Sequence, residues 1–100
     1  MGLAVDSIVS PGCIVSGGRV TRSVLAPFVR VNSYCDVDES ILMPRVTVGR
    51  YSRVRCAILC EDVVLEENSR VGFSADEDRA KGRVVTDSGI TVVPSPFLKL

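Results

Sequence analysis

Histidine and tryptophan are absent from this sequence of 100 residues, and aromatic residues make up only 5% of it. The 12 Lys and Arg residues cancel the 12 Asp and Glu residues, so no net charge draws the chain to nucleic acid or to an anionic membrane. No apolar run approaches the roughly 18 residues of a membrane span, and the first residues lack the pattern of a signal peptide. We therefore expect a cytoplasmic protein that binds neither nucleic acid nor membrane.

The missing histidine also limits metal and catalytic chemistry. A zinc site is not expected, because the cysteines lack paired C-x-x-C spacing and no histidine completes a ligand set. A reducing cytosol also disfavours disulfides between the four thiols, which belong to Cys13, Cys35, Cys56 and Cys60. Acyltransferases that use a histidine base and carbonic anhydrases that need three histidine ligands are likewise not expected. The sequence shows no catalytic constellation.

What the sequence does contain is a repeat of seventeen residues. Large aliphatic residues recur at steps of six, five and six, in the pairs Ile14/Val20, Val31/Val37, Val48/Val54 and Leu65/Val71 and at Ile8, Leu25, Leu42 and Leu59. The residue two before each is usually small: Gly12, Gly18, Ser23, Val29, Cys35, Ser40, Val46, Ser52, Ala57, Val63 and Ser69. Because side chains alternate along a strand, both positions point inward.

Three short faces in each turn of seventeen residues predict an all-β fold, a parallel β-helix of about four coils over residues 5–72. Successive coils stack at about 4.8 Å, the spacing of neighbouring strands. Pro27 and Pro44 fall at the same corner. The alternative is an ordinary β-sandwich whose aliphatic residues recur by chance.

Residues 73–100 break the repeat and are predicted to form a C-terminal cap and tail. Asp76–Lys81 suits a short helix that ends at Gly82, and Arg83–Thr86 and Ile90–Val93 suit a hairpin. The carboxylates of Asp76-Glu77-Asp78 are expected to be a solvated helix start.

The predicted outward positions differ among the faces. One face carries an apolar stripe where a soluble prism should be polar, and we interpret it as an interface formed by Val24, Ala26, Ile41, Met43, Ile58 and Cys60. Another face stacks opposite charges, with Arg19, Asp36, Arg53 and Arg70 in one ladder and Thr21, Asp38 and Arg55 beside it. Pairing across coils would fix the register. The alternative role for this face, which we favour less than pairing, is that Arg50, Arg53, Arg55 and Arg70 hold a phosphate.

Several segments resemble bacterial ADP-glucose pyrophosphorylases, the glucose-1-phosphate adenylyltransferases. Ser23-Val24-Leu25 followed by Val31-Asn32-Ser33 is similar to that family's S-V-L…V-N-S stretch. The opening Asp6–Gly17, the V-G-R at 48–50, and the ending Glu77-Asp78 with Gly89–Pro94 agree as well. The resemblance spans residues 5 to about 94.

The resemblance implies a left-handed β-helix and a longer parent protein. In that family an N-terminal nucleotidyltransferase domain, absent from this chain, uses magnesium to make ADP-glucose and pyrophosphate from ATP and glucose 1-phosphate for glycogen synthesis. No catalytic, cofactor or metal residue therefore carries over. The C-terminal domain packs on the catalytic domain, contributes to a homotetramer and helps bind sugar-phosphate or nucleotide effectors.

Two positions bear on effector binding. The family's last residues are rich in Arg and Lys, and Lys99 is the one candidate here. Glu61-Asp62 stand where the family often has a basic residue, and their charge would repel a phosphate. Two further interpretations stay open: a stand-alone structural β-helix that mediates assembly, and the β-helix of another sugar-nucleotide pyrophosphorylase.

Overall fold

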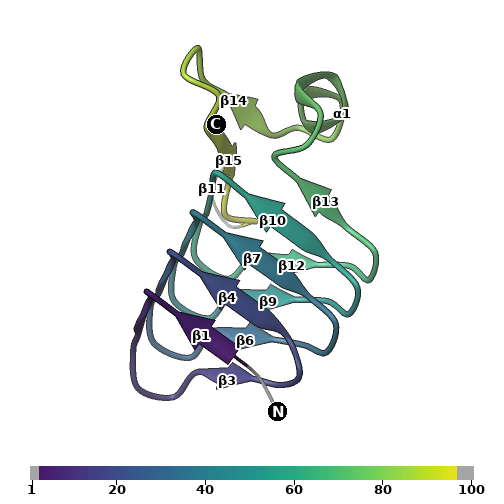
Figure 1. Ribbon diagram of the computed structural model, residues 1–100. Helices are drawn as coiled ribbons and strands as arrows, with labels where there is room; N and C mark the ends of the chain where they lie inside the picture. Colours follow the sequence, from purple (N-terminus) through teal and green to yellow (C-terminus); the bar gives the residue numbers. More distant parts are fainter. Residues whose placement is uncertain (1–2, 97–100) are drawn as a thin grey trace.

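The computed structural model describes residues 3–96, which form a triangular coil of short parallel strands closed at one end by a helix and a hairpin (Figure 1). Three sheets form the sides of the triangle, and each is named here after its first strand. The β1 sheet contains β1 (Leu3–Val5), β4 (Arg19–Thr21), β7 (Asp36–Asp38), β10 (Arg53–Arg55) and β13 (Arg70–Val71). The β2 sheet contains β2 (Ile8–Val9), β5 (Val24–Leu25), β8 (Ile41–Leu42), β11 (Ala57–Leu59), β15 (Thr91–Val93) and β14 (Val84–Val85). The β3 sheet contains β3 (Ile14–Val15), β6 (Arg30–Val31), β9 (Thr47–Val48) and β12 (Val64–Leu65).

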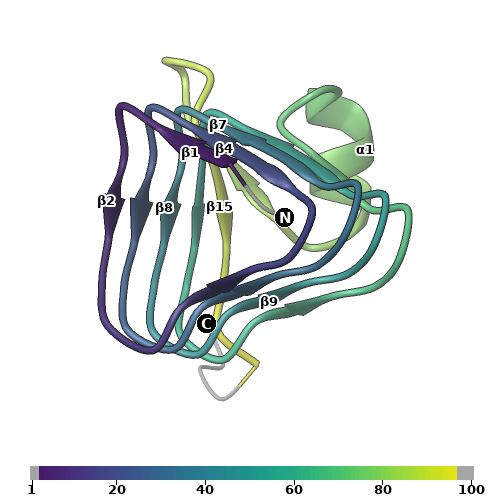
Figure 2. The same cartoon turned by 60° about the horizontal axis from the view of Figure 1, so that its bottom comes forward.

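The strand register confirms the predicted repeat. Strands of neighbouring coils pair in parallel, and Leu25 lies opposite Leu42 as Val31 lies opposite Val48. Figure 2 looks along the stack from the N-terminal coil, and the chain runs anticlockwise as it recedes. The β-helix is therefore left-handed, as the resemblance implied.

The core consists of ladders of aliphatic side chains that run along the axis. Leu25, Leu42 and Leu59 are each 0% exposed and form one ladder. Burial of one such side chain contributes about 1.5–3 kcal/mol, so a ladder contributes a large share of a small domain's stability. The predicted small inward residues from Gly18 to Val63 are also buried, including Cys35 and Ser52, whereas Ser69 in the last coil is half-buried.

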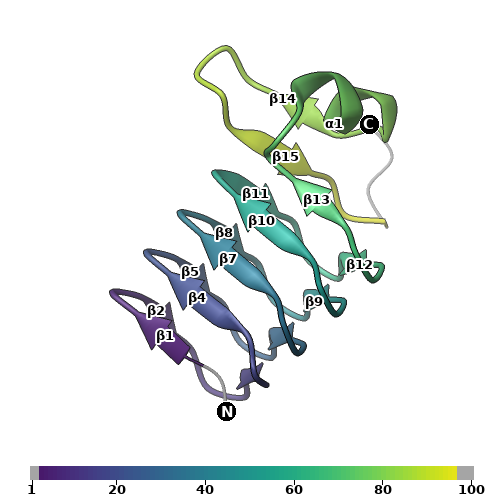
Figure 3. The same cartoon turned by 45° about the vertical axis from the view of Figure 1, so that its right-hand side comes forward.

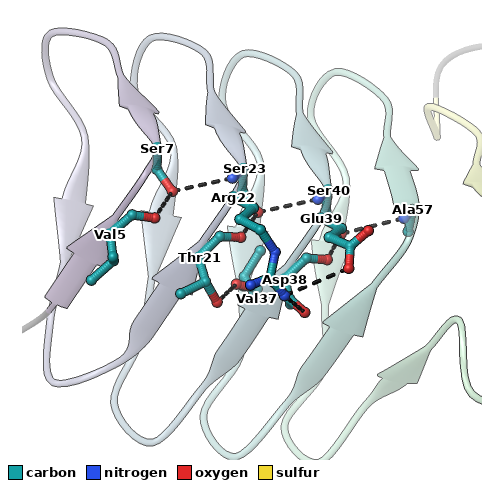
Figure 4. Close-up of polar contacts among 10 residues, drawn as sticks. All are labelled: Val5, Ser7, Thr21, Arg22, Ser23, Val37, Asp38, Glu39, Ser40 and Ala57. Atoms are coloured by element: carbon teal, nitrogen blue, oxygen red, sulfur yellow. Dashed lines mark hydrogen bonds and ion pairs between the residues drawn. The ribbon is translucent and has the colours of Figure 1, made fainter.

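One corner of the triangle is held by a column of serines (Figure 4). The Oγ atoms of Ser7 and Ser23 each accept a hydrogen bond of 3.1 Å from the backbone N–H of the serine one coil later. Ser40 Oγ accepts in the same way from the N–H of Ala57 at 3.3 Å. A hydroxyl at this inward position therefore satisfies a backbone donor that a purely apolar side chain would leave unpaired.

The corners depend on residues in the left-handed backbone region. After the first coil, nine non-glycine residues hold φ between 46° and 63°, a conformation that costs roughly 1–2 kcal/mol for each. Each of them donates its backbone N–H to a carbonyl oxygen of the preceding coil, as Arg45 does to Pro27 at 3.2 Å and Asp62 does to Pro44 at 3.1 Å. Hydrogen bonds between coils thus offset the corner strain.

The first coil departs from the predicted register. The sequence repeat places Ile8 and Ile14 inside, but they are 67% and 48% exposed, and Val9 and Val15 align with the core of the next coil. The predicted inward Gly12 is exposed as well. The cause is the corner after β3, which has three residues where the later coils have four. Partners therefore lie 16 residues apart between the first two coils and 17 apart afterwards.

The cap contains the predicted helix and hairpin. Helix α1 (Ala75–Ala80) begins after Ser74, whose Oγ accepts a hydrogen bond of 3.3 Å from the N–H of Glu77. The chain leaves the helix through Gly82, which has a φ of 80°. Strands β14 and β15 pair antiparallel and form the hairpin.

Strand β15 also continues the β2 sheet. It pairs in parallel with β11, so Thr91 lies opposite Ala57 and Val93 lies opposite Leu59. Val93 follows Leu59 at a distance of two repeats. The residues between them that could have formed one further coil form α1 and β14 instead. The second strand of the hairpin therefore takes the place of a coil strand.

Candidate functional site

The outward side of the β2 sheet carries two adjoining rows of apolar side chains, which we call the apolar stripe. The first row follows the strand register through Ile8, Val24, Ile41, Ile58 and Val92. The second row consists of the residues that directly follow β5, β8 and β11, which are Ala26, Met43 and Cys60. Val24 and Ile41 are 37% and 42% exposed, and Ile58 is half-buried. The structure thus brings the six residues that the sequence predicted for an interface to one sheet, although Ala26, Met43 and Cys60 are half-buried and Cys60 packs partly against the core.

Two members of the stripe were not predicted from the sequence. Ile8 was placed in the core because the short first corner shifts the register. Val92 was assigned only to the hairpin, although its distance of two repeats from Ile58 was a signal for the same row. At this end of the stripe a hollow of about 250 Å³ is lined by Glu39, Ile41, Cys56, Ala57, Ile58 and Ile90. A hollow of this kind can receive an aliphatic side chain of a partner surface.

The β1 sheet carries the predicted charged ladder. Arg19, Asp36, Arg53 and Arg70 lie opposite one another in successive strands, and Thr21, Asp38 and Arg55 form the adjoining row. The predicted ion pairing across coils is wrong for Asp36, because within residues 3–96 no Arg or Lys nitrogen lies within 4.0 Å of its carboxylate. Asp36 is exposed, and water screens its charge there.

Asp38 pairs with a corner residue instead (Figure 4). Arg22 Nη2 lies 2.8 Å from Asp38 Oδ2 and 3.5 Å from Glu39 Oε1. The other oxygen of Asp38, Oδ1, is buried and has no hydrogen-bond partner among the described residues. Asp38 also helps to line a depression of about 320 Å³, together with Arg19, Arg22, Arg53, Arg55 and Phe73.

The predicted phosphate-binding arginines are partly assembled. Arg53 and Arg70 are neighbours on β10 and β13, and within the described range no carboxylate oxygen lies within 4.0 Å of either guanidinium. Arg55 instead stacks its guanidinium 4.5 Å from the centre of the Phe73 ring. Arg50 lies at the corner before β10, and Lys99 lies outside the described residues. Arg53 and Arg70 are therefore the arginines best placed to meet an anion together.

Glu61 and Asp62 meet a positive charge at the corner between the β2 and β3 sheets. Arg45 Nε lies 2.7 Å from Asp62 Oδ1, and Arg45 Nη2 lies 3.4 Å from Glu61 Oε2. The hydrogen bond from Arg45 lowers the pKa of Asp62, and the same contact raises the pKa of Arg45. The repulsion of phosphate that the sequence predicted here is therefore reduced by Arg45.

Asp78 is buried, which corrects the prediction that the acidic helix start is solvated. Its side chain is only 2% exposed, and its Oδ1 lies 2.7 Å from Nη1 of Arg83, which is 8% exposed. Asp78 Oδ2 accepts hydrogen bonds from the backbone N–H of Gly72 at 3.1 Å and from Thr91 Oγ1 at 3.3 Å. Arg83 also donates to the backbone carbonyl of Arg70 at 2.8 Å. The network joins the helix and hairpin to the last coil.

Among residues 3–96 no three His, Cys, Asp or Glu side chains are grouped so that they could hold a metal ion. Burial raises the pKa of the Cys35 thiol, which donates a hydrogen bond of 2.9 Å to the carbonyl of Gly49. This thiol is structural rather than nucleophilic. No helix in that range is long and apolar enough to cross a membrane.

Comparison with known families accounts for the coils and the cap together. The family described as GlmU-like, C-terminal hexapeptide matches residues 1–93. The chain belongs to this family. This GlmU-like hexapeptide domain is also similar to longer proteins named glucose-1-phosphate adenylyltransferase. That of Bifidobacterium adolescentis is 56% identical over 94 residues, which cover 94% of this chain and 23% of the relative.

Two further relatives agree with this result. The glucose-1-phosphate adenylyltransferase of Koribacter versatilis is 55% identical over 97 residues, which cover 97% of the hexapeptide domain and 23% of the relative. The corresponding protein of Bifidobacterium animalis subsp. lactis is 63% identical over 94 residues, with coverage of 94% and 23%. The hexapeptide domain thus spans about a quarter of the length of the curated relatives it matches.

Proposed function

We propose that this chain is the regulatory and oligomerisation domain of a glucose-1-phosphate adenylyltransferase. The whole protein would make ADP-glucose and pyrophosphate from ATP and glucose 1-phosphate, in the cytoplasm, for glycogen synthesis. Identities of 55–63% to proteins of that name over nearly the whole chain support this activity. The reacting groups and the Mg²⁺ ligands would belong to the preceding N-terminal domain, which this chain does not include.

The apolar stripe is the observation that carries the domain's own role. It crosses five strands of the β2 sheet, whereas the corresponding outward positions of the β1 sheet are mostly arginine and aspartate. Soluble monomers seldom expose such a continuous apolar row, so a partner surface should cover it. The partner would be the protein's own catalytic domain or a neighbouring subunit of a homotetramer.

The β1 sheet is the proposed site for a phosphate-bearing effector. Arg53 and Arg70 have no carboxylate partner among the described residues and lie on adjacent strands, where their forked guanidinium groups can contact phosphate oxygens. Arg50, Arg55 and Lys99 are secondary candidates. A sugar phosphate or a nucleotide would supply the anionic group.

The test of the docking role uses the full-length protein with the double substitution Ile41→Glu and Ile58→Glu. Both side chains point outward, so the β-helix should fold, while charge on the stripe should prevent docking. Sedimentation should show loss of the tetramer, and formation of ADP-glucose should fall with it. The matched control is Val64→Glu, an outward aliphatic residue of the β3 sheet that is 69% exposed.

Two outcomes would contradict the proposal. An unchanged tetramer with unchanged activity in the double variant would make the stripe ordinary surface. A wild-type full-length protein that forms no ADP-glucose would remove the enzymatic assignment and favour a stand-alone structural β-helix or another sugar-nucleotide specificity. For the effector site, Arg53→Gln with Arg70→Gln should weaken the response of activity to sugar phosphates and nucleotides, and an unchanged response would exclude these arginines.

A further inference from the structure

Strands β1 and β2 lie at one end of the stack of coils (Figure 3), and the core side chains of this N-terminal coil are exposed. Val9 points inward, yet it is 44% exposed, whereas its neighbour in the next coil, Leu25, is 0% exposed. Val15 is half-buried, although its neighbour Val31 is completely buried. The side chains that should be the first rungs of the core ladders therefore face an open end.

The backbone is unpaired at the same end. Strands β1, β2 and β3 are each the last strand of their sheet, so alternate N–H and C=O groups face away from the next coil. In later coils each left-handed corner residue donates its N–H to the coil before it. Asp6, Gly12 and Gly17 hold the same conformation, but within residues 3–96 their N–H groups have no acceptor.

The opposite end of the molecule is closed. Helix α1 and the hairpin cover the last coil, and β15 completes the β2 sheet there. Proteins usually protect edge strands with charge, proline, bulges or a covering segment. The three N-terminal edge strands contain only Leu, Ala, Val and Ile, and among residues 3–96 no further strand pairs with their free edges.

We propose that the open end is an internal contact surface, covered by a further coil that the segment directly preceding Met1 forms in the longer protein. The chain enters the β-helix at β1, so preceding residues emerge at this end. If these residues continued the coil with the same hand, they would lie next to β2, then next to β3, and would then enter β1. The relatives are about four times as long as this chain and therefore have residues to supply the coil. A second copy is the poorer occupant, because the entering chain would obstruct it.

The proposal predicts a sequence pattern in the preceding segment. Large aliphatic or aromatic residues should stand 16 or 17 positions before Val9 and Val15, because those distances separate ladder neighbours in this chain. A small residue should stand two positions before each of them, as in the later coils. This pattern concerns folding and does not depend on the enzymatic assignment.

Hydrogen exchange compares the full-length protein with the 100-residue chain. The amides of Val9 and Val15 should exchange about tenfold or more slowly in the full-length protein, because a covering strand supplies their hydrogen-bond acceptors. The amides of Leu25 and Val31 serve as internal references, since both forms already bury them. Equal exchange at Val9 and Val15 in the two proteins would overturn the proposal.

A pair of adjacent substitutions gives an independent readout in the full-length protein. Val15→Asp should lower the midpoint of thermal unfolding of the β-helix by about 10 °C or more, because the carboxylate would lie between two coils. Ile14→Asp, on the same strand but pointing outward, should change it by less than about 2 °C. Equal shifts would contradict a covering coil. Protection of Val9 that appears only as the short chain dimerises would instead assign the surface to a second copy.

Discussion

Asp78 and Arg83 form a buried salt bridge between the helix and the hairpin of the cap, with 2.7 Å between Oδ1 and Nη1. Asp78 also accepts hydrogen bonds from Gly72 at the end of the last coil and from Thr91 on β15. One carboxylate therefore connects three segments that are separate in the sequence. A buried pair of this kind contributes little net stability, but removal of one partner leaves the other charge uncompensated.

The substitution Asp78→Ala should therefore destabilise the domain by about 3–5 kcal/mol, a large part of the stability of a small domain. Urea denaturation measures the change. Glu77→Ala is the matched control, since Glu77 makes only an exposed contact of 3.4 Å with Lys81 and its loss should cost less than about 0.5 kcal/mol. Similar losses in the two variants would show that Asp78 is not buried in a network.

The inward register predicts opposite effects for two adjacent residues of β9. Val48 is 0% exposed, so Val48→Asp should abolish the cooperative thermal transition, because the core offers the carboxylate no partner. Thr47 points outward on the same strand, and Thr47→Asp should change stability by less than about 1 kcal/mol. Circular dichroism melts distinguish the two variants, and a wild-type melt for Val48→Asp would refute the register.

Acid should remove the contribution of the pair formed by Arg45 and Asp62. The hydrogen bond from Arg45 holds the pKa of Asp62 below its ordinary value of 3.8. The stabilisation is therefore fully present above that value and is lost as the pH falls through the lowered pKa of the folded state. Arg45→Met should reduce stability at pH 7 and have no effect at a pH below the titration of Asp62. Urea midpoints at both pH values, with an NMR titration of the Asp62 carboxyl group, provide the test.

Gly72 and Gly89 have nearly equal φ angles, 87° and 89°, but different surroundings. A Cβ atom at Gly72 would collide with the carbonyl oxygen of Arg55, whereas nothing lies within 4 Å of such an atom at Gly89. Gly89→Ala should thus cost about 1 kcal/mol from the backbone conformation alone. Gly72→Ala should cost at least about 2 kcal/mol more, because backbone must move. Equal losses in denaturant would mean that the last coil adjusts freely.

The repeat made most of the fold predictable. Core residues such as Leu25, Leu42 and Leu59 recur at a constant spacing because each coil stacks directly on the last. The first coil was not predictable, since Ile8-Val9 and Ile14-Val15 place two aliphatic residues side by side. Either member of each pair fits the core, and hydrophobicity cannot choose between them. The short corner after β3 decides the choice.

The candidate site was predictable to the same extent. Alternation along each strand placed Val24, Ile41 and Ile58 on one outward row, and the register bears this out. The position of Asp78 was not predictable, because three adjacent acidic residues at a helix start look alike in sequence. Only the arrival of Arg83 and Thr91 from the hairpin determines which carboxylate is buried.

The parallel register has a consequence for how the chain folds. Strand partners in the coils are always 16 or 17 residues apart, so closing each new coil costs nearly the same conformational entropy wherever it lies. The mean sequence separation between contacting residues therefore stays constant as coils are added, whereas it grows in sheets that join distant parts of a chain. Folding of such a stack can start at any pair of coils and spread to its neighbours, as in a one-dimensional array, and unfolding should begin at whichever end is least covered.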